Sequence, residues 1–251
     1  YEYGEKEIQM RPLIVYSSQN TASLNIANQM EGNIDMIDVN DSIIGFQPPE
    51  TNRDYYIVLS SHSSKSGIPS ATVHVPGNWG KAELGGLDSR LCISYPSKML
   101  EIISRYEPLR YRGFEITYEV DHHGPFFGKP VMFVELGSDE RYWNDSEAAK
   151  VIARAVLDSI DSSDEYDVYF GIDGTHYVPK LTRYSLENRV AYSHLLARYQ
   201  DGFRDEMFKQ ALELSVERVD GILVAKKAVD KYQKDYIRGF AERYGVELKF
   251  I

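Results

Sequence analysis

The chain has 251 residues, of which 43% are hydrophobic, and carries 38 acidic against 28 basic side chains, a formal net charge of −10. This balance argues against broad attraction to a polyanion, so a nucleic-acid partner would need a local basic surface. The single cysteine, Cys92, excludes an internal disulfide framework. No run approaches the ~20 apolar residues of a membrane helix, and the N-terminus lacks a signal-peptide pattern. We therefore expect a cytoplasmic protein without a membrane partner.

Apolar periodicity predicts strands and helices that alternate along the chain. The predicted strands and short apolar segments cover residues 11–18, 54–61, 114–121, 130–137, 167–172, 221–225 and 246–251. The predicted helices cover residues 21–30, 97–110, 144–160, 203–217 and 226–244. Thr21 or Asn20 is expected to cap the first helix, Pro108 to end the second, and Asn144 or Asp145 to cap the third. This order predicts one α/β domain over residues 1–251, with inserted loops.

Histidines follow three of the predicted strands. They are His62 and His74 in "HSSKSGIPSATVHVPGNWG" (62–80), His122 and His123 in "DHHGP", and His176 in "GIDGTHYVP". Ligands of open α/β sheets bind where strands end, and imidazole suits both proton transfer near neutral pH and zinc. A single histidine is more often a surface or structural residue, so it is their coincidence at strand ends that favours a shared site.

The neighbours of these histidines sharpen the expectation. His122 and His123 would face opposite sides of a strand unless Gly124 and Pro125 bend the chain, and we expect one to bind and the other to orient. We expect the 62–80 loop to be a rigid turn that presents His62 and His74 from its two ends. The spacing matches neither a zinc ribbon nor HExxH. Three carboxylates beside the histidines are candidate ligands or partners of the ligands: Asp121, Asp173 and Glu135.

Other motifs exclude or weaken alternatives. Neither GxGxxG nor GxxxxGK[ST] occurs, so no nucleotide cofactor is expected, and no G-x-S-x-G turn supports a serine nucleophile. Cys92 is expected to be buried. His194, in "NRVAYSHLLARY", is predicted on a helix that supports the site from behind. The stretch from Lys226 to Lys249 is basic, and it is either a nucleic-acid contact or a solvated helix face. Its candidate contacts are Lys226, Lys227, Lys231 and Lys234.

The chain resembles the archaeal and plant-type D-aminoacyl-tRNA deacylases over roughly residues 12–250. Four motifs, in this order, carry the resemblance: "HSSKSGIPSATVHVPGN", "HHGP", "GIDGTHYVPKLT" and "SHLLARY". The resemblance implies a three-layer α/β/α phosphorylase/hydrolase-like domain with a mixed, mostly parallel sheet. It also implies hydrolysis of the ester between a D-amino acid and the tRNA 3′ end, releasing free tRNA and the D-amino acid in chirality proofreading. Zn²⁺ is the implied cofactor, and tRNA charged with D-amino acids is the implied partner.

The family motifs transfer onto this chain residue by residue. The implied catalytic residues, with a metal-binding subset among them, are His62, His74, His122, His123 and His176. The implied substrate-binding residues are Ser64, Thr72, Asn78, Gly124, Gly174 and Tyr177. The chain departs from the family pattern at Val120 and Asp121, where Ala-Thr is usual, at Asp173 and Thr175, where glycines are usual, and at Ser193, where Gly is common.

Two other functions remain as alternatives. One is a different metal-dependent hydrolase on the same fold, a nucleosidase or a peptidase, because fold does not fix function. The other is a non-catalytic RNA-binding module. Histidines that share one cleft within about 8 Å would favour catalysis, and scattered histidines would favour the module. We expect a monomer.

Overall fold

Strands and helices alternate along the chain in a computed structural model that describes residues 10–251. The strands are β1 (Pro12–Tyr16), β2 (Met36–Asp38), β3 (Tyr55–Ser61), β4 (Ser70–His74), β5 (Gly77–Asn78), β6 (Arg90–Leu91), β7 (Glu115–Tyr118), β8 (Val131–Gly137), β9 (Asp167–Asp173), β10 (Val190–Ala197), β11 (Gly221–Val224) and β12 (Glu247–Phe250). The helices are α1 (Thr21–Ala27), α2 (Pro96–Ser104), α3 (Glu107–Tyr111), α4 (Glu140–Trp143), α5 (Ser146–Ile160), α6 (Pro179–Asn188), α7 (Asp205–Glu213) and α8 (Lys231–Tyr244).

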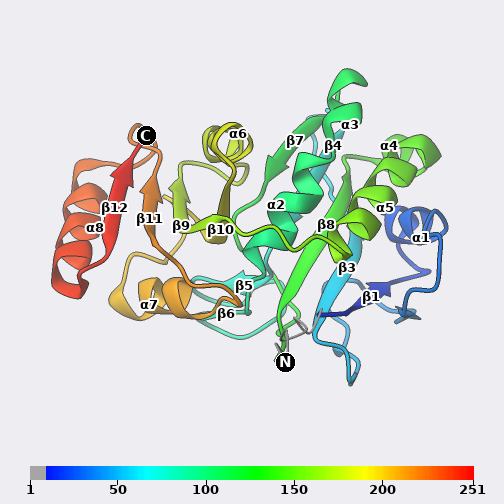
Figure 1. Ribbon diagram of the computed structural model, residues 1–251, viewed down its shortest axis with the longest axis horizontal. Coiled ribbons are helices and arrows are strands. Elements are labelled where there is room, and N and C mark those ends of the chain that lie inside the picture. Colours follow the sequence, from blue (N-terminus) through cyan, green and yellow to red (C-terminus); the bar gives the residue numbers. More distant parts are fainter. Residues whose placement is uncertain (1–9) are drawn as a thin grey trace, which may run out of the picture.

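The strands form two main sheets that lie side by side in Figure 1. The first has the order β2-β1-β3-β8-β4-β7 and the second the order β10-β9-β11-β12. All neighbours in these sheets are parallel except β4 and β8. The predicted mixed, mostly parallel α/β architecture is therefore confirmed, although its strands are divided between two sheets. β5 and β6 form a small antiparallel pair.

Helices flank both sheets and complete a three-layer α/β/α arrangement. α1 and α5 pack against the first sheet, α7 against the second, and α8 against β12 at the far end (Figure 1). α2 and α6 contact strands of both sheets: α2 lies against β10, β4 and β7, and α6 against β7, β9 and β10. Polar caps begin the helices: Asn20 and Asp145 accept backbone N–H groups of α1 and α5, and Asp230 forms a capping box on α8. The interior is apolar, and the side chains of β8 are buried along its whole length.

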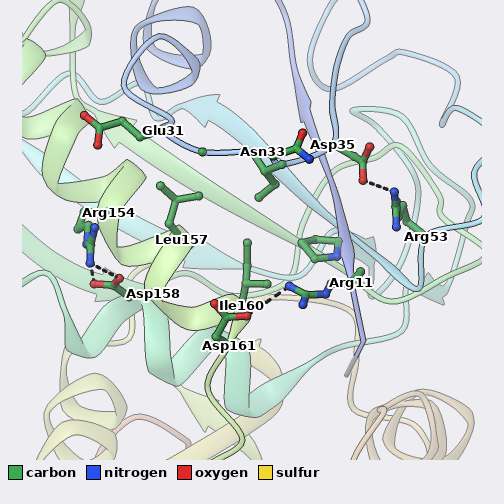
Figure 2. A pocket seen from close by; sticks show the side chains of 13 residues that line it. Arg11, Glu31, Asn33, Asp35, Arg53, Arg154, Leu157, Asp158, Ile160 and Asp161 are labelled. Atoms are coloured by element: carbon green, nitrogen blue, oxygen red, sulfur yellow. Dashed lines mark hydrogen bonds and ion pairs between the residues drawn. The ribbon is translucent and has the colours of Figure 1, made fainter. Parts of the chain in front are cut away.

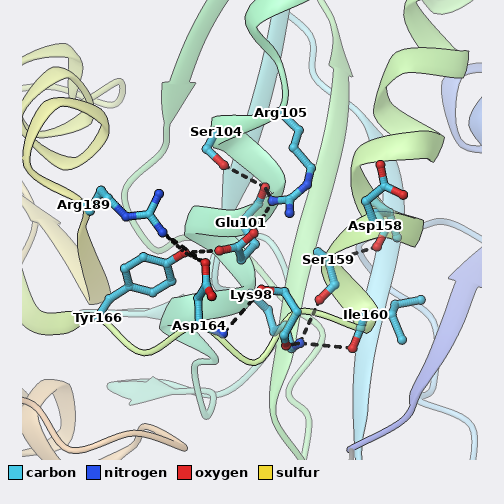
Figure 3. Close-up of polar contacts among 12 residues, drawn as sticks. Lys98, Glu101, Ser104, Arg105, Asp158, Ser159, Ile160, Asp164, Tyr166 and Arg189 are labelled. Carbon is cyan, nitrogen blue, oxygen red and sulfur yellow. Dashed lines mark hydrogen bonds and ion pairs between the residues drawn. The ribbon is translucent and has the colours of Figure 1, made fainter.

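One buried polar network joins α2 to the end of α5 (Figure 3). Lys98 and Glu101 are each 4% exposed. The Lys98 ammonium donates to the carbonyls of Ser159 (2.7 Å), Ile160 (3.1 Å) and Ser162 (2.6 Å), where α5 ends and its carbonyls lack helical partners. Glu101 accepts from Arg105 and from the Tyr166 hydroxyl. Each buried charge in this network thus has partners.

Three helix predictions are wrong in their bounds. The expected helix 97–110 is two helices, α2 and α3, and Pro108 lies in the first turn of α3, where its missing N–H is not needed. α7 covers only part of 203–217. α8 begins at Lys231 instead of residue 226 because the Asp230 capping box sets its start. No helix within residues 10–251 is both long and apolar enough to span a membrane.

Two further predictions mistook strands for other structure. His194 lies on strand β10 and not on a helix, because α6 ends at Arg189 in the left-handed conformation and the next eight residues are all buried. A continuously buried segment has no polar face whose period would separate helix from strand. The 62–80 segment is not one turn either, since its residues 70–74 form β4 within the first sheet.

Candidate active site

The site lies where the two sheets meet. β7 is the edge strand of the first sheet and β10 that of the second. The chain that continues β7 bonds to the second sheet: Val120 N–H donates to the His176 carbonyl (3.0 Å), and Asp121 N–H donates to the Leu195 carbonyl (2.9 Å). Residues 119–121 therefore join the end of β7 to two segments of the second sheet: the loop after β9, which carries His176, and the last residues of β10.

One face of the first sheet supplies further site residues. Thr72 and His74 of β4 stand opposite Glu135 and Phe133 of β8, and cross-strand partners project from the same face. The His74 ring stacks on Phe133, with ring centroids 5.3 Å apart. His74 therefore stands on the surface of the sheet, whereas His62 follows the end of β3.

The structure brings together all five of the histidines expected in the site. The His122 ring centroid is 4.3 Å from that of His74, 4.4 Å from that of His123 and 4.6 Å from that of His176, and the His62 and His176 centroids are 6.0 Å apart. His122 and His123 do not face opposite ways, because His123 has a φ of 47° that turns the chain. The bend thus begins at His123 itself, one residue before Gly124.

A buried carboxylate, Glu119, is surrounded by these rings. Its oxygens lie 3.0 Å from His62 Nδ1, 2.8 Å from His176 Nε2 and 3.6 Å from His122 Nε2, and its side chain is 0% exposed. Burial alone would raise the pKa of Glu119, but hydrogen bonds from His176 and His62 outweigh it and hold the pKa well below its usual range. Glu119 is therefore an anion at the centre of the cluster.

Glu119 was not among the site residues predicted from the sequence. The segment "FEITYEVD" alternates, which places Thr117 and Glu119 on one side of β7, but a polar side is usually the solvated one. The period alone could not show that this side faces the second sheet.

His62 and Glu135 form a second part of the cluster. Burial opposes the charge on His62, yet hydrogen bonds to Glu119 and Glu135 outweigh it and raise the pKa of His62 to about 10. Burial and the neighbouring Glu119 charge raise the pKa of Glu135 to about 7. Glu135 Oε2 lies 3.5 Å from His62 Nδ1. The prediction that Glu135 stands beside the histidines thus agrees with this geometry.

His74, His122 and His123 are neutral imidazoles. Burial lowers the pKa of His122 to about 3 and that of His123 to about 4, and holds that of His74 well below its usual range. His122 Nδ1 lies 2.8 Å from the Val120 carbonyl and His123 Nδ1 lies 2.5 Å from the Gly124 carbonyl. Each Nδ1 must donate to its carbonyl, so each Nε2 keeps a lone pair that points into the cluster.

The same three rings fit a zinc ion. One ring nitrogen from each lies within 4.8 Å of the others. His74 Nε2 and His123 Nε2 are 3.2 Å apart, close to the ~3.3 Å between two ligands of a tetrahedral zinc with bonds of ~2.0–2.1 Å. His74 Nδ1 is buried without a hydrogen-bond partner among the described residues. Two further groups, His62–Glu119–His176 and His74–Glu119–Glu135, also have converging ligand atoms.

Two predicted metal-site carboxylates lie outside the cluster. Asp121 Oδ2 is 2.6 Å from His194 Nδ1 and points toward the second sheet. Asp173 accepts from its own neighbour Gly174 (2.7 Å) and from Leu181 N (3.4 Å). Neither residue belongs to a group of converging ligand atoms in the described chain. Adjacency in sequence misled here because successive residues of an extended chain point to opposite sides.

Three of the predicted substrate-binding residues, Thr72, Asn78 and Gly124, shape the walls of the site. The Asn78 side-chain amide donates to the Gly85 (2.9 Å) and Leu87 (3.3 Å) carbonyls. Thr72 is 0% exposed within the sheet. Gly124 packs so closely on Gly85–Gly86 that a Cβ there would meet Gly86 N at 2.2 Å. These residues therefore hold the backbone around the histidines.

The remaining candidates lie at the rim of the site. Tyr177 is half-buried, with its ring centroid 5.3 Å from that of His62. Ser64 is partly exposed in the loop after β3, where its N–H donates to the Ser138 carbonyl. Gly174 follows β9 and adjoins Ala228. Because Lys226 and Lys227 are exposed just before Ala228, these lysines lie near the segment that carries His176.

A cavity of about 830 Å³ lies elsewhere, by the amino ends of β1 and β3 (Figure 2). Arg11 and Arg53 precede those strands and pair with Asp161 and Asp35. His62 follows the opposite, carboxyl end of β3, and none of the clustered histidines lines this cavity, so the cavity is separate from their cluster. Its arginines serve ion pairs, which leaves the histidine cluster as the candidate site of chemistry.

Five clustered imidazoles beside buried carboxylates, in a mixed α/β fold, are the side chains of a hydrolase-type site. Such sites act by proton transfer or with a metal. The profile of the D-aminoacyl-tRNA deacylase family matches residues 49–249. The chain is 35% identical to a D-aminoacyl-tRNA deacylase of Pyrococcus furiosus over 76% of this chain and 71% of that protein. It is 32% identical to one of Thermoplasma acidophilum over 86% of this chain and 85% of that protein.

The fold has a solved counterpart. A crystal structure described as a conserved protein of unknown function superposes with a TM-score of 0.86 at 30% identity, over 96% of this chain and 95% of that one. This chain belongs to the D-aminoacyl-tRNA deacylase family.

Proposed function

We propose that this protein hydrolyses the ester between a D-amino acid and the 3′ end of tRNA, releasing both in chirality proofreading. Family membership supports the substrate, and the clustering of five histidines around the site, three of them within 3.6 Å of Glu119, supports the chemistry. Histidines that converge favour catalysis over an RNA-binding module. The ester of an aminoacyl-tRNA is activated, so modest catalysis suffices.

The chain's own residues can each take a role in ester hydrolysis. His62, held as a cation by Glu119 and Glu135, can stabilise the negative charge that develops on the carbonyl oxygen. His176, 39% exposed and bonded to Glu119, faces the approach to the cluster and can carry a proton between Glu119 and the reacting atoms. Tyr177 and the segment around Ser64 border this approach. The substrate then enters from the side of His176, and the buried rings lie beyond it.

Zinc is the proposed cofactor, and His74, His122 and His123 are the residues that would hold it. Zinc bound there supplies a Lewis acid that polarises the ester carbonyl and lowers the pKa of a water toward ~7. The carbonyl groups of Val120 and Gly124 hold two of the rings in the tautomer that a metal needs. Metal analysis of protein purified without chelator tests the assignment.

The tRNA is proposed to contact Lys226 and Lys227, which precede Ala228 beside Gly174, together with Lys231 and Lys234 in the first turn of α8. A local basic surface is needed because the chain as a whole carries a charge of −10. We also propose that the chain acts as a single-domain monomer in the cytoplasm, without a nucleotide cofactor.

A single-turnover assay tests the proposed function. Purified protein is mixed with D-tyrosyl-tRNA or L-tyrosyl-tRNA, with zinc or after treatment with a chelator. We expect rapid release of D-tyrosine and little release of L-tyrosine. D-tyrosyl-tRNA that stays intact under both conditions contradicts the deacylase function. Loss of a nucleobase or of a peptide bond in matched assays would instead support the nucleosidase or the peptidase.

A further inference from the structure

Asp121 and His194 form a buried pair. None of their printed hydrogen bonds reaches the five clustered histidines, but Asp121 directly precedes His122 and His123 in the chain. Each is 1% exposed. His194 Nδ1 lies 2.6 Å from Asp121 Oδ2, and His194 Nε2 lies 2.8 Å from the Leu214 carbonyl. Both ring nitrogens of His194 thus lie within hydrogen-bond distance of an oxygen, and the ring is fixed from two sides. A buried pair of polar side chains costs free energy to desolvate, and the cluster itself does not explain why it is there.

A β-bulge places His194 in this position. Tyr192 of β10 pairs with Tyr169 of β9, but the next pair is Leu195 with Gly171, so β10 advances three residues where β9 advances two. The extra residue lies at Ser193–His194. Bulges redirect side chains and are common beside active sites. Here the bulge directs His194 away from the regular alternation and toward Asp121.

Asp121 is bound on all sides by the second sheet and the chain that follows it. Its N–H donates to the Leu195 carbonyl (2.9 Å) and its carbonyl accepts from Gln200 Nε2 (2.8 Å). Its carboxylate accepts from Leu195 N–H (3.0 Å) as well as from His194. The residue before His122 thus has no freedom to rotate, although it belongs to the continuation of a first-sheet strand.

The turn held in this way is strained. His123 has a φ of 47°, a left-handed conformation that costs free energy for a residue with a Cβ and persists only when its surroundings impose it. On the far side of the turn, Gly77 N–H donates to the His123 carbonyl (2.9 Å). Asp121 fixes the near side. The conformation that points both Nε2 atoms into the cluster is therefore held at both ends.

We propose that the Asp121–His194 pair is a positioning device, which sets the His122–His123 turn so that its two imidazoles keep the geometry needed for zinc and for ester hydrolysis. Its role is exerted through the backbone, because neither side chain meets the cluster. The inference rests on the proposed function in that zinc and D-aminoacyl-tRNA serve as its probes.

The test compares Asp121→Asn, His194→Gln and the double variant with a control, Ser193→Ala. Ser193 lies on the same bulge, but its hydroxyl donates to the Ala211 carbonyl (2.9 Å) and does not contact Asp121. Zinc alone is titrated into metal-free protein against a chromophoric chelator. The melting temperature, kcat and KM on D-tyrosyl-tRNA are measured on the same samples, well below the melting temperature of each variant.

Each single substitution disrupts the buried hydrogen bond between Asp121 and His194, and we expect a ~10–100-fold loss of zinc affinity with a lower kcat and an unchanged KM. The double variant forms a neutral amide pair and should regain most of the zinc affinity and kcat. Ser193→Ala should match the unsubstituted protein in zinc affinity. A purely structural role would lower the melting temperature alone.

Single variants that are folded and keep zinc affinity and kcat overturn the inference. If the single variants do not fold, the double variant decides, and a stable double variant that recovers neither quantity also overturns it. If the unsubstituted protein binds no zinc, the proposed cofactor is wrong, and the kcat values of the variants then test the positioning role. If the unsubstituted protein binds zinc but leaves D-tyrosyl-tRNA intact, the proposed substrate is wrong, and the zinc affinities of the variants then test the positioning role.

Discussion

Two buried polar clusters in this protein are built on opposite principles. Around Lys98 and Glu101, each charge has partners: the ammonium meets three carbonyls at the end of α5, and the carboxylate accepts a guanidinium and a phenol (Figure 3). Around Glu119, neutral rings crowd each other, and His74 Nδ1 has no hydrogen-bond partner among the described residues. A saturated network stabilises a fold, whereas unused lone pairs in a buried site cost stability and are kept for a ligand.

The sharpest way to break this comparison is His74→Ala. We expect kcat on D-tyrosyl-tRNA to fall by ~10²-fold or more, as the loss of acid-base or metal chemistry typically causes. The melting temperature should barely move, because the substitution also removes an unpartnered buried nitrogen. Steady-state kinetics and thermal unfolding of the same sample measure both. Near-normal turnover with a large loss of stability would make His74 a structural residue.

Charge reversal outside both clusters has the next largest expected effect. Lys226→Glu with Lys227→Glu should weaken tRNA binding and flatten its dependence on salt by about one unit of slope for each phosphate that is no longer neutralised. Hydrolysis of a small D-amino acid ester should be unchanged, because both side chains are exposed and lie outside the cluster.

A control for these lysines carries the same charge change elsewhere. Arg110→Glu with Lys150→Glu alters exposed residues of α3 and α5. Affinity for tRNA, measured at several salt concentrations, should be lower in the first pair than in the second. Equal affinities would return Lys226 and Lys227 to the role of an ordinary solvated surface.

Lys98→Met tests the saturated cluster. Carbonyls of Ser159 and Ser162 lose a charged donor, and we expect a loss of ~1–3 kcal/mol in the free energy of unfolding. At ~2–4 °C per kcal/mol for a chain of this size, the melting temperature should fall by several degrees while kcat stays constant. Lys150→Met, on the exposed side of α5, is the matched control. A change in kcat without a change in melting temperature would reverse the assignment of the two clusters.

The sequence predicted the two clusters unequally. Histidines after strands were visible in it, as was Glu135 within the apolar strand "PVMFVELG". Glu119 was hidden, because the alternation of "FEITYEVD" gives a polar side but not what covers that side. Asp121 was expected to bind or orient the clustered histidines, whereas its side chain bonds to His194, 73 residues away on a strand of the other sheet.

The same limit applies to the fold. Local period and capping residues predicted most strands and helices and the mostly parallel arrangement. They carry no information on which strands pair, so the division into two sheets and the joint between them, where the site lies, could not be read from the pattern. The bulge in β10 is a property of its pairing with β9, and it too is visible only in the structure.

The smallest expected effect is a pH dependence of stability that distinguishes His62 from the residues of the saturated cluster. The pKa of His62 is raised to about 10 in the folded protein because hydrogen bonds to Glu119 and Glu135 outweigh the effect of burial, whereas an unfolded histidine titrates near ~6.5. Between these values the folded protein binds the extra proton, so stability falls as pH rises. The contribution of His62 to stability is complete below the unfolded pKa and is lost as the pH rises through the folded pKa.

In chelator-treated protein, the melting temperature of the unsubstituted chain should exceed that of His62→Gln by more at pH 6 than at pH 9. The gap for Lys98→Met should stay constant or widen over the same range, because burial lowers the pKa of folded Lys98 whereas an unfolded lysine remains charged there. A gap for His62→Gln that does not shrink with rising pH would mean that His62 is neutral in the folded cluster, and the stabilising charge proposed for the carbonyl oxygen would then have to come from another residue.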